Sequence, residues 1–453
     1  MTKNIFYIFI LKFFILIFFI NKIAFANSLL IKNINLIDGS GAPLLSNVNI
    51  LVENGRFVKI SSSFVNLNKN IKIIDGEGKF LIPGLIDSHI HLPGGRTGPG
   101  NKKMVLNFKT GKKFLESYLY SGVTSVYDSN NNPDYIFKLR ADERSGSILS
   151  PRIFATLSLV APPGGHGCCA GGIPVNDFSY GKERLEELFL LKPDLLKFTR
   201  ESRGMGAESR NLPLMDKGLF KRLISFSHEN NLRVTVHVSE NTLASEAIEA
   251  GADAFAHIPY IDPITDGLID KIVKNGIILS TTITRVENDS SYLDREIFKD
   301  TVDIETIKNI KLHERFGTPK DLENLSPLVK WIRSVRAILI DNIKRLHEKG
   351  AIIALGTDRP LGPILHYELE LIVEAGVNPI QAIKMATLNS AKYIGVDDDL
   401  GSIEEGKIAD MVILNSNPLD NITNTTSIDS VYKGGIKVNR SLLDVPINRL
   451  NDG

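Results

Sequence analysis

Two histidines, one residue apart, end an apolar run in the segment "LIPGLIDSHIHL". They are His89 and His91. Alternate side chains of an extended strand point to the same face, so this spacing places both imidazoles together at the end of a buried segment. Neutral imidazole is a common ligand of Zn²⁺ and other transition metals. The pair therefore predicts a metal site to which other parts of the chain must contribute.

Four more polar side chains interrupt or end short apolar runs farther along the chain. Lys197 lies in "PDLLKFT", His237 in "VTVHVSE", His257 in "AFAHIP" and Asp358 in "IIALGTD". Taken singly, each has a plainer explanation, such as a structural hydrogen bond, a salt bridge or a helix cap. Their recurrence at successive apolar runs favours one shared set of nitrogen and oxygen donors for Zn²⁺ or a similar cation.

Lys197 requires a separate argument, because a lysine ammonium has only hydrogen-bond donors and cannot bind a cation. Burial between cations lowers the pKa of an amine and makes its neutral form available. The neutral amine reacts with CO₂ to give a carbamate, whose two oxygens can bridge two metal ions. A carboxylated lysine therefore explains why Lys197 stands among candidate metal ligands, and a structural lysine is the alternative.

A change of rhythm at Ile82 separates two kinds of structure. Before it, short alternating strands are separated by Gly and Asn, which are hairpin signals. After it, short apolar strands alternate with helical stretches, which is typical of a parallel sheet. Eight such strands are expected, at Leu85–His91, Val123–Asp128, Arg152–Leu157, Leu195–Thr199, Val234–Val238, Ala254–Ile258, Ile277–Thr282 and Ile352–Asp358.

Eight strands with helices between them predict an α/β fold with a (β/α)₈ TIM-like barrel, whose active site lies at the C-terminal ends of the strands. A charged, helix-rich insertion at about 288–350 either caps the barrel mouth or forms a solvated excursion. Short strands return after Leu400, so both chain ends are expected to form one small β-sandwich domain. The expected boundaries are 27–81 and 395–453 for this domain and 82–394 for the barrel.

The first 26 residues have the layout of a secretory signal peptide, with Lys3, an apolar run and the small-residue site Ala24-Phe25-Ala26. An uncleaved anchor is the alternative, although the apolar run after Lys12 is shorter than the roughly 20 residues that a spanning helix needs. Cleavage would leave 50 of the 53 basic residues against 52 acidic ones, a net charge of −2. We therefore expect a periplasmic or secreted protein with no electrostatic reason to bind nucleic acid or a membrane surface.

The two cysteines of the chain, Cys168 and Cys169, are adjacent. A disulfide between them would close only a small strained ring, so buried thiols are favoured and their oxidation is left open. The expected partner of the protein is a small molecule or short peptide. A homo-oligomer is compatible with the sequence, which does not indicate a particular oligomeric state.

The ordered motifs "IPGLIDSHIH", "LLKFT", "VTVHVS", "FAHIP" and "IALGTD" resemble the amidohydrolase superfamily of metal-dependent hydrolases. The segment "LHYELELIVEAGVNPIQAIKMATLNSAKYIGVDDDLGSIEEGKIADMVILNSNPL" is similar to the C-terminal part of its imidazolonepropionase-like and prolidase-like branch. The resemblance extends from Leu30 to about Asn439. It implies a metal-dependent enzyme that hydrolyses carbon–nitrogen bonds.

The resemblance also implies roles for the six candidate ligands. His89 and His91 would bind one divalent metal ion with Asp358, and His237 and His257 would bind a second, with carboxylated Lys197 and a hydroxide between the two ions. A metal ion lowers the pKa of bound water from 15.7 to about 7, so hydroxide is available at neutral pH.

Asp358 would be the catalytic proton shuttle from this hydroxide to the leaving nitrogen. Zinc is the expected metal, although manganese, iron and cobalt suit the same donors. The expected substrate is a dipeptide, an N-acyl amino acid or a cyclic amide. Asp87, just before the histidine pair, is expected to orient the strand end rather than to bind metal.

Three residues are candidates for substrate binding. His166, in the glycine-rich segment "APPGGHGCCAGG", resembles a substrate-facing histidine of the prolidase-like branch. Arg359 directly follows Asp358 and is a candidate to clamp a substrate carboxylate bidentately, with a salt bridge at the barrel rim as the alternative. Tyr260 follows His257 closely and is expected to line the pocket.

Two other functions compete with a two-metal amidohydrolase. The spacing His237-x-x-Glu240 suits a mononuclear heterocycle hydrolase or deaminase, in which Glu240 carries protons and Lys197 is structural. A solvated Glu240 in the first turn of a helix is the plainer explanation. A catalytically inactive binding protein predicts missing ligands, whereas all six are present. The motifs do not name the substrate, and they leave the identity and number of the metal ions open.

Overall fold

A computed structural model describes residues 28–63, 71–95, 106–168, 171–204, 211–312 and 327–447 of the 453-residue chain. The predicted signal peptide and Cys169 lie outside the described residues, and Cys168 is half-buried. Among the described residues, no helix combines the length and the apolar character needed to cross a membrane.

All eight predicted parallel strands are present, each within the predicted range. Their bounds are β6 (Leu85–Ile90), β7 (Val123–Asp128), β8 (Arg152–Ala155), β11 (Leu196–Thr199), β12 (Val234–His237), β13 (Ala254–Phe255), β14 (Ile278–Ser280) and β15 (Ile352–Ala354). All of them pair in parallel, and most of their residues are buried. Burial on both faces explains why the sequence shows apolar runs here instead of alternation.

The strands form two parallel sheets. One has the order β6-β7-β8, and the other has the order β10-β9-β11-β12-β13-β14-β15, where β9 (Val160–Ala161) and β10 (Ile173–Pro174) are two-residue additions. Backbone hydrogen bonds outside the strand pairs join the two sheets at both edges, from Ser88 N to Leu355 O at 2.9 Å and from Asp194 N to Ala155 O at 3.0 Å. The strands are therefore arranged as in a TIM barrel.

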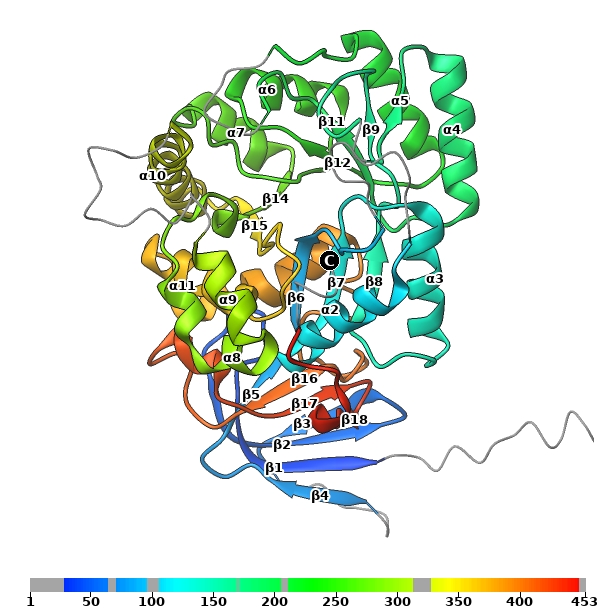
Figure 1. Ribbon diagram of the computed structural model, residues 1–453. Coiled ribbons are helices and arrows are strands. Elements are labelled where there is room, and N and C mark those ends of the chain that lie inside the picture. Colours follow the sequence, from blue (N-terminus) through cyan, green and yellow to red (C-terminus); the bar gives the residue numbers. More distant parts are fainter. Residues whose placement is uncertain are drawn as a thin grey trace, which may run out of the picture.

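Helices follow the strands and cover the outside of this barrel (Figure 1). Side-chain caps explain several of their starts. Asn132 precedes Pro133 at the first helical position, and Asp177 and Asp216 accept hydrogen bonds from backbone amides of the first turn. The bounds are α2 (Phe108–Tyr120), α3 (Pro133–Arg144), α4 (Phe178–Leu190), α5 (Lys217–Glu229), α6 (Asn241–Ala250), α7 (Asp266–Lys274), α11 (Ile364–Glu374), α12 (Pro379–Lys384), η5 (Met385–Asn389) and α13 (Ser390–Ile394).

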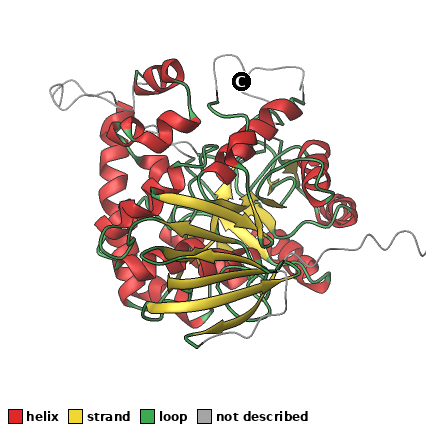
Figure 2. Cartoon of the chain, turned by 90° about the horizontal axis from the view of Figure 1, so that it is seen from below, coloured by secondary structure: helices red, strands yellow, loops and turns green. Residues whose placement is uncertain are grey.

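The two chain ends form one eight-stranded mixed sheet beside the barrel (Figures 1 and 2). Its order is β18-β17-β16-β5-β1-β2-β3, and β4 pairs with β1. The expected union of both ends is therefore present as a single hydrogen-bonded sheet, and its form as a β-sandwich stays a prediction. The bounds are β1 (Leu29–Leu36), β2 (Leu45–Glu53), β3 (Arg56–Ser61), β4 (Lys72–Asp75), β5 (Phe80–Pro83), β16 (Met411–Leu414), β17 (Ile428–Lys433) and β18 (Ile436–Lys437).

The sheet is joined to the start of the barrel by a short connection and by a partly buried ion pair. Strand β5 pairs with β16 and continues after Gly84 into β6. Arg152 of β8 donates to both carboxylate oxygens of Asp410, at 2.7 and 3.0 Å. Bidentate contacts of this kind fix orientation as well as distance. The sheet therefore supports the strand that carries His89.

The predicted insertion is helical where it is described. It contains η2 (Ser291–Asp294), α8 (Glu296–Thr301), α9 (Ile304–Lys311) and α10 (Pro327–Glu348), whereas residues 313–326 lie outside the described part. Helix α10 contacts the segment that follows β13, because the Asn342 amide donates to the carbonyls of Pro259 and Asp262. The insertion thus packs against the C-terminal ends of the barrel strands and is not a free excursion.

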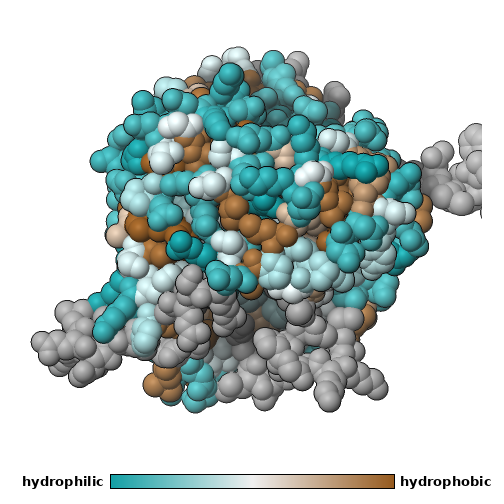
Figure 3. Space-filling model, turned by 90° about the horizontal axis from the view of Figure 1, so that it is seen from above, coloured by the Kyte–Doolittle hydropathy of each residue, from teal (hydrophilic) through white to brown (hydrophobic). Residues whose placement is uncertain are grey.

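The surface seen from above is mostly hydrophilic, with apolar areas separated by polar residues (Figure 3). Exposed leucines such as Leu190 and Leu312 occur on different helices. Scattered apolar side chains of this kind are normal on a protein surface.

Candidate metal centre

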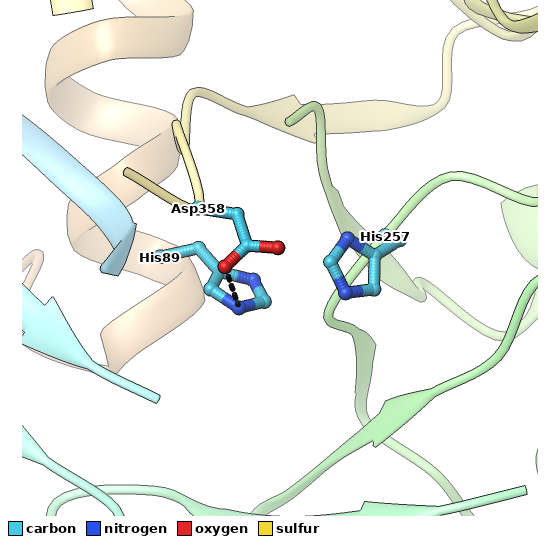
Figure 4. Close-up of side chains that lie close together, drawn as sticks. All are labelled: His89, His257 and Asp358. Carbon is cyan, nitrogen blue, oxygen red and sulfur yellow. Dashed lines mark ion pairs between the residues drawn. The ribbon is translucent and has the colours of Figure 1, made fainter. Parts of the chain in front are cut away.

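Three of the predicted ligands meet where the barrel strands end (Figure 4). His89 is the next-to-last residue of strand β6, His257 follows β13 and Asp358 follows β15. One potential ligand atom from each lies within 4.8 Å of the others. The C-terminal ends of parallel barrel strands open on one face, which explains why residues so far apart in sequence converge here.

His91 and Lys197 lie against the same group. The His91 Nε2 atom is 3.4 Å from Asp358 Oδ1, and His89 Nε2 is 4.0 Å from the same oxygen. The Lys197 Nζ atom lies 3.2 Å from His89 Nε2, and its side chain is buried. The Nε2 atom of His89 therefore lies close to both Lys197 Nζ and the carboxylate of the catalytic candidate Asp358.

The outward-facing ring nitrogens of three histidines are held by protein oxygens. The Nδ1 atom of His89 is 2.8 Å from the carbonyl of Ala256, and that of His91 is 3.2 Å from the carbonyl of Asn130. The Nδ1 atom of His257 is 2.8 Å from the hydroxyl of Thr282. Because a carbonyl can only accept, His89 and His91 carry their hydrogen on Nδ1 and present the Nε2 lone pair to the site.

His237 completes the cluster from the end of β12. Its ring centroid lies 4.6 Å from that of His257 and 3.9 Å from that of His166, on which it stacks. Its buried Nε2 atom makes no hydrogen bond within the described ranges, and it lies 3.7 Å from a carboxylate oxygen of the fully buried Glu201. Carboxylates beside ligand histidines commonly orient the ring.

The electrostatics of the cluster favour neutral imidazoles. Burial, followed by the neighbouring His166, His257 and Lys197, lowers the pKa of His237 well below its ordinary value. Burial, followed by the neighbouring His89, does the same to the pKa of His257. Metal ions bind the neutral form of histidine, so both rings are in the protonation state that metal binding requires.

Asp87 fastens the end of β6 to the segment after β15. Its Oδ1 atom accepts from the backbone amides of His89 and Thr357, both at 3.1 Å, and its Oδ2 accepts from the Thr357 hydroxyl at 2.7 Å. Burial raises the pKa of Asp87 well above its ordinary value. Both oxygens are engaged by donors of the protein, which supports the predicted orienting role for Asp87.

The backbone around Asp358 is unusual. Asp358 has a φ of +50°, and Thr282, beside His257, has a φ of +55°. Such conformations are strained for residues with a side chain and concentrate at functional sites. At Gly356, a Cβ atom would lie 2.3 Å from Ser280 Oγ and 2.7 Å from the Cβ of His89. Only glycine therefore allows the end of β15 to pass so close to His89.

The three predicted substrate residues have different surroundings. His166 lies at the centre, stacked on His237. Tyr260 is buried, and its hydroxyl makes no hydrogen bond among the described residues. Arg359 instead turns toward the backbone, and its guanidinium donates to the carbonyls of Thr284 and Arg285. A clamp on a substrate carboxylate stays a prediction for Arg359.

Glu240 is engaged away from the central group. One of its carboxylate oxygens accepts from the Ser202 hydroxyl and lies 3.9 Å from Nε of Arg203. These contacts tie Glu240 to the segment after β11. They give no support to a role as the main proton carrier.

Two residues of the site were not predicted from the sequence. Arg285 lies in the short helix η1 (Ile283–Val286) after β14, and its Nε atom is 3.4 Å from Asp358 Oδ2. Glu201, beside His237, follows β11 by two residues. Inspection of the residues that follow each strand, and not only of those that end it, would have found both.

The side chains present suit metal ions. The candidate donors are the Nε2 atoms of His89 and His91, the neutral His257, the buried Nε2 of His237, which makes no hydrogen bond in the described part of the chain, and the Asp358 carboxylate. Nitrogen and oxygen donors in this combination match the preferences of zinc and its neighbours.

A model of the amidohydrolase family matches residues 80–438. The chain belongs to the amidohydrolase family. The resemblance identified from the motifs is thereby confirmed, and the protein is a hydrolase that acts on carbon–nitrogen bonds.

The individual relatives have low sequence identity to this chain or match only a short part of it. This amidohydrolase is 38% identical to imidazolonepropionase of Symbiobacterium thermophilum over 78 residues, which is 16% of this chain and 18% of that protein. It is 23% identical to enamidase of Eubacterium barkeri over 411 residues, or 87% of this chain and 88% of that one. A crystal structure of a Xaa-Pro dipeptidase shares the fold, with a TM-score of 0.74, 24% identity and coverage of 91% of this chain and 99% of the other.

Proposed function

We propose that this amidohydrolase binds two divalent metal ions, with zinc favoured, and hydrolyses the amide bond of a dipeptide, an N-acyl amino acid or a cyclic amide. The observation that carries the proposal is the convergence of six side chains at the strand ends: His89, His91, Lys197, His237, His257 and Asp358. Each offers, or in the case of lysine can acquire, a donor atom for a cation.

Lys197 would act in carboxylated form. Its neutral Nζ adds to CO₂ and loses one proton, which gives a carbamate with two oxygen donors. The buried position of Lys197, with Nζ 3.2 Å from His89 Nε2, supports this step because an ammonium so close to a metal-binding histidine would repel a cation. A carbamate replaces that repulsion with an anion.

The chemical step then depends on groups of the chain. When bound, the metal ions supply an activated water and polarise the scissile carbonyl. Asp358 accepts at its carboxylate the proton that the attacking water loses and delivers it to the leaving nitrogen. His166 and Tyr260 would hydrogen-bond the substrate, because the first stacks on His237 and the second has a buried hydroxyl with no hydrogen bond in the described part of the chain.

A second candidate is a mononuclear deaminase or heterocycle hydrolase. A 5'-deoxyadenosine deaminase of Methanococcus aeolicus is 23% identical to this chain over 402 residues. The contacts of Glu240 with Ser202 and Arg203 speak against this candidate, because it needs Glu240 as the proton carrier. A catalytically inactive binding protein is less favoured still, since no predicted ligand is missing. We further propose that residues 1–26 direct secretion.

Metal counting and product analysis test the proposal. We expect two equivalents of metal in the purified protein and about one in Lys197→Met, while the exposed control Lys182→Met on α4 keeps two. A ¹³C-carbamate signal after incubation with labelled bicarbonate should disappear in Lys197→Met only. Hydrolysis of dipeptides, N-acyl amino acids or lactams should release an amine and an acid. A single equivalent in both proteins, or release of ammonia from a heterocycle instead, would overturn the proposal.

A further inference from the structure

Arg285 has a guanidinium group with few contacts to the described part of the chain. Its buried Nε atom makes no hydrogen bond among the described residues, and its one ion-pair partner there is Asp358, at 3.4 Å from Nε to Oδ2. About a third of its side chain is exposed. An arginine with five donors is normally engaged when it is this close to the interior, so the group is poised for a ligand.

The turn that carries Arg285 is held firmly from two sides. Arg359 donates to the carbonyls of Thr284 and Arg285, and the buried Glu368 of α11 accepts from the backbone amides of Ile283 and Thr284 at 2.7 and 2.8 Å. These two side chains therefore fix the backbone at Arg285, whose guanidinium has Asp358 as its one charged partner in the described part of the chain. A rigid turn that presents a fork of donors suits specific binding.

The surroundings of this guanidinium indicate what it binds. Asp358 is the nearest acid, and in the proposed function it is engaged by metal, so Arg285 requires another anion. Tyr260 follows His257 by three residues, and its buried hydroxyl makes no hydrogen bond among the described residues. The planar fork of N–H donors on Arg285 matches a carboxylate, which accepts bidentately.

The distance to Asp358 restricts where that carboxylate stands in the substrate. Asp358 would serve the scissile amide, and Arg285 Nε is 3.4 Å from it. One residue of extended chain spans only about 3.3–3.6 Å. The recognised carboxylate must therefore lie within about one residue of the bond that breaks.

We propose that Arg285 binds the α-carboxylate on the leaving-amine side of the substrate. This inference rests on the proposed function and narrows it, because it selects dipeptides and N-acyl α-amino acids over lactams without a carboxylate. Arg285 thus takes the role that the sequence suggested for Arg359, and Arg359 positions the turn.

The protein contains an internal probe for ligand binding. Trp331 on α10 is the only tryptophan of the chain, and its ring centroid lies 6.4 Å from that of Tyr260. A ligand that contacts Tyr260 should therefore change the tryptophan fluorescence. This readout does not depend on turnover.

The test compares N-methanesulfonyl L-amino acids with their C-terminal carboxamides. These sulfonamides lack the N-acyl carbonyl at which the proposed hydrolysis occurs, and each pair differs only in its terminal group, a carboxylate or a carboxamide. Affinities for the metal-loaded protein are measured by calorimetry and by Trp331 fluorescence. We expect acids to bind roughly 10- to 100-fold more tightly than amides, as expected for hydrogen bonds to a charged group.

The Arg285→Gln variant should lose most of this preference, and Arg285→Lys should keep part of it because it keeps the charge without the fork. The control Arg222→Gln removes an exposed cation on α5, outside the barrel, and should bind as the wild type does. Equal binding of acids and amides by the wild type, no binding of any acid, or an equal loss for both ligands in Arg285→Gln would overturn the inference.

The outcome for Arg285 is separable from the proposed function. Hydrolysis of N-acyl amino acids and of their carboxamides at equal kcat/KM would support the amidohydrolase activity and contradict the role of Arg285. Selective binding of the acids without hydrolysis of any amide would support Arg285 and contradict the proposed reaction.

Discussion

Replacing Asp87 by alanine removes the acceptor for three donors behind the candidate metal centre. These are the amides of His89 and Thr357 and the hydroxyl of Thr357. The site is fully buried, so water does not replace the carboxylate. The Thr357 amide and hydroxyl have second, weaker acceptors at 3.3 and 3.2 Å, so the substitution weakens their hydrogen bonding without removing it.

The expected loss of stability follows from these contacts. The loss of a buried hydrogen bond costs about 1–3 kcal/mol, so three lost hydrogen bonds, two of them with weaker second acceptors, and a small cavity sum to roughly 3–5 kcal/mol. Asp87→Asn should cost only about 1 kcal/mol. Its oxygen can still accept from both amides, and its NH₂ group can donate to Thr357 Oγ. Since burial raises the pKa of Asp87, asparagine also resembles the neutral acid.

Denaturant midpoints at unchanged slope measure these differences, and metal content per chain reports on the position of His89. The exposed Asp270 on α7 provides a control, because Asp270→Ala should change stability by less than about 0.5 kcal/mol. An alanine variant as stable as the wild type, or an asparagine variant as unstable as the alanine one, would refute the reasoning.

Two buried groups on α11 should give opposite dependences of stability on pH. Burial lowers the pKa of His366 to about 4, so the unfolded state is protonated first as the pH falls. The contribution of His366 to the free energy of unfolding is complete above about pH 6.5. It decreases by about 3 kcal/mol as the pH falls to 4. His366→Gln should lack this acid loss in denaturant midpoints at pH 7.5 and 5, and an equal loss in both proteins would contradict the assignment. Burial raises the pKa of Glu368 to about 7, so stability that is complete below about pH 4.5 falls as the pH rises to 7. Glu368→Gln should therefore gain relative to the wild type in thermal midpoints between pH 5 and 8, and parallel pH profiles would show that Glu368 is not responsible.

The barrel strands were predictable because local chemistry marks them. Each is a short apolar run, and those that supply the site end near a polar residue whose type suits a ligand. The convergence of these ends follows from parallel pairing alone, so His89, His257 and Asp358 could be expected together before any distance was known.

The remaining features depend on contacts that the local pattern does not contain. The union of both chain ends was predicted, but not its pairing: β5 pairs with β1 and, across more than 300 positions, with β16, which joins both ends in one sheet. Arg359 follows a residue with positive φ, so the direction of its side chain cannot be read from its position after Asp358. Arg285 was missed because it lies in the short helix η1, beyond the end of β14, and not in the residues that end the strand.

Two buried carboxylates support the two halves of the proposed reaction separately. Asp87 holds Thr357 next to Asp358, which would move the proton, and Glu368 holds Ile283 and Thr284 next to Arg285, which would bind the substrate carboxylate. Asp87 accepts from backbone amides of two segments, at His89 and Thr357, whereas Glu368 accepts from two adjacent amides of one turn. A substitution at Asp87 should therefore first lower metal binding and kcat. A substitution at Glu368 should first raise KM for carboxylate substrates. The fold thus places chemistry and recognition on adjacent strand ends, each with its own buried anchor.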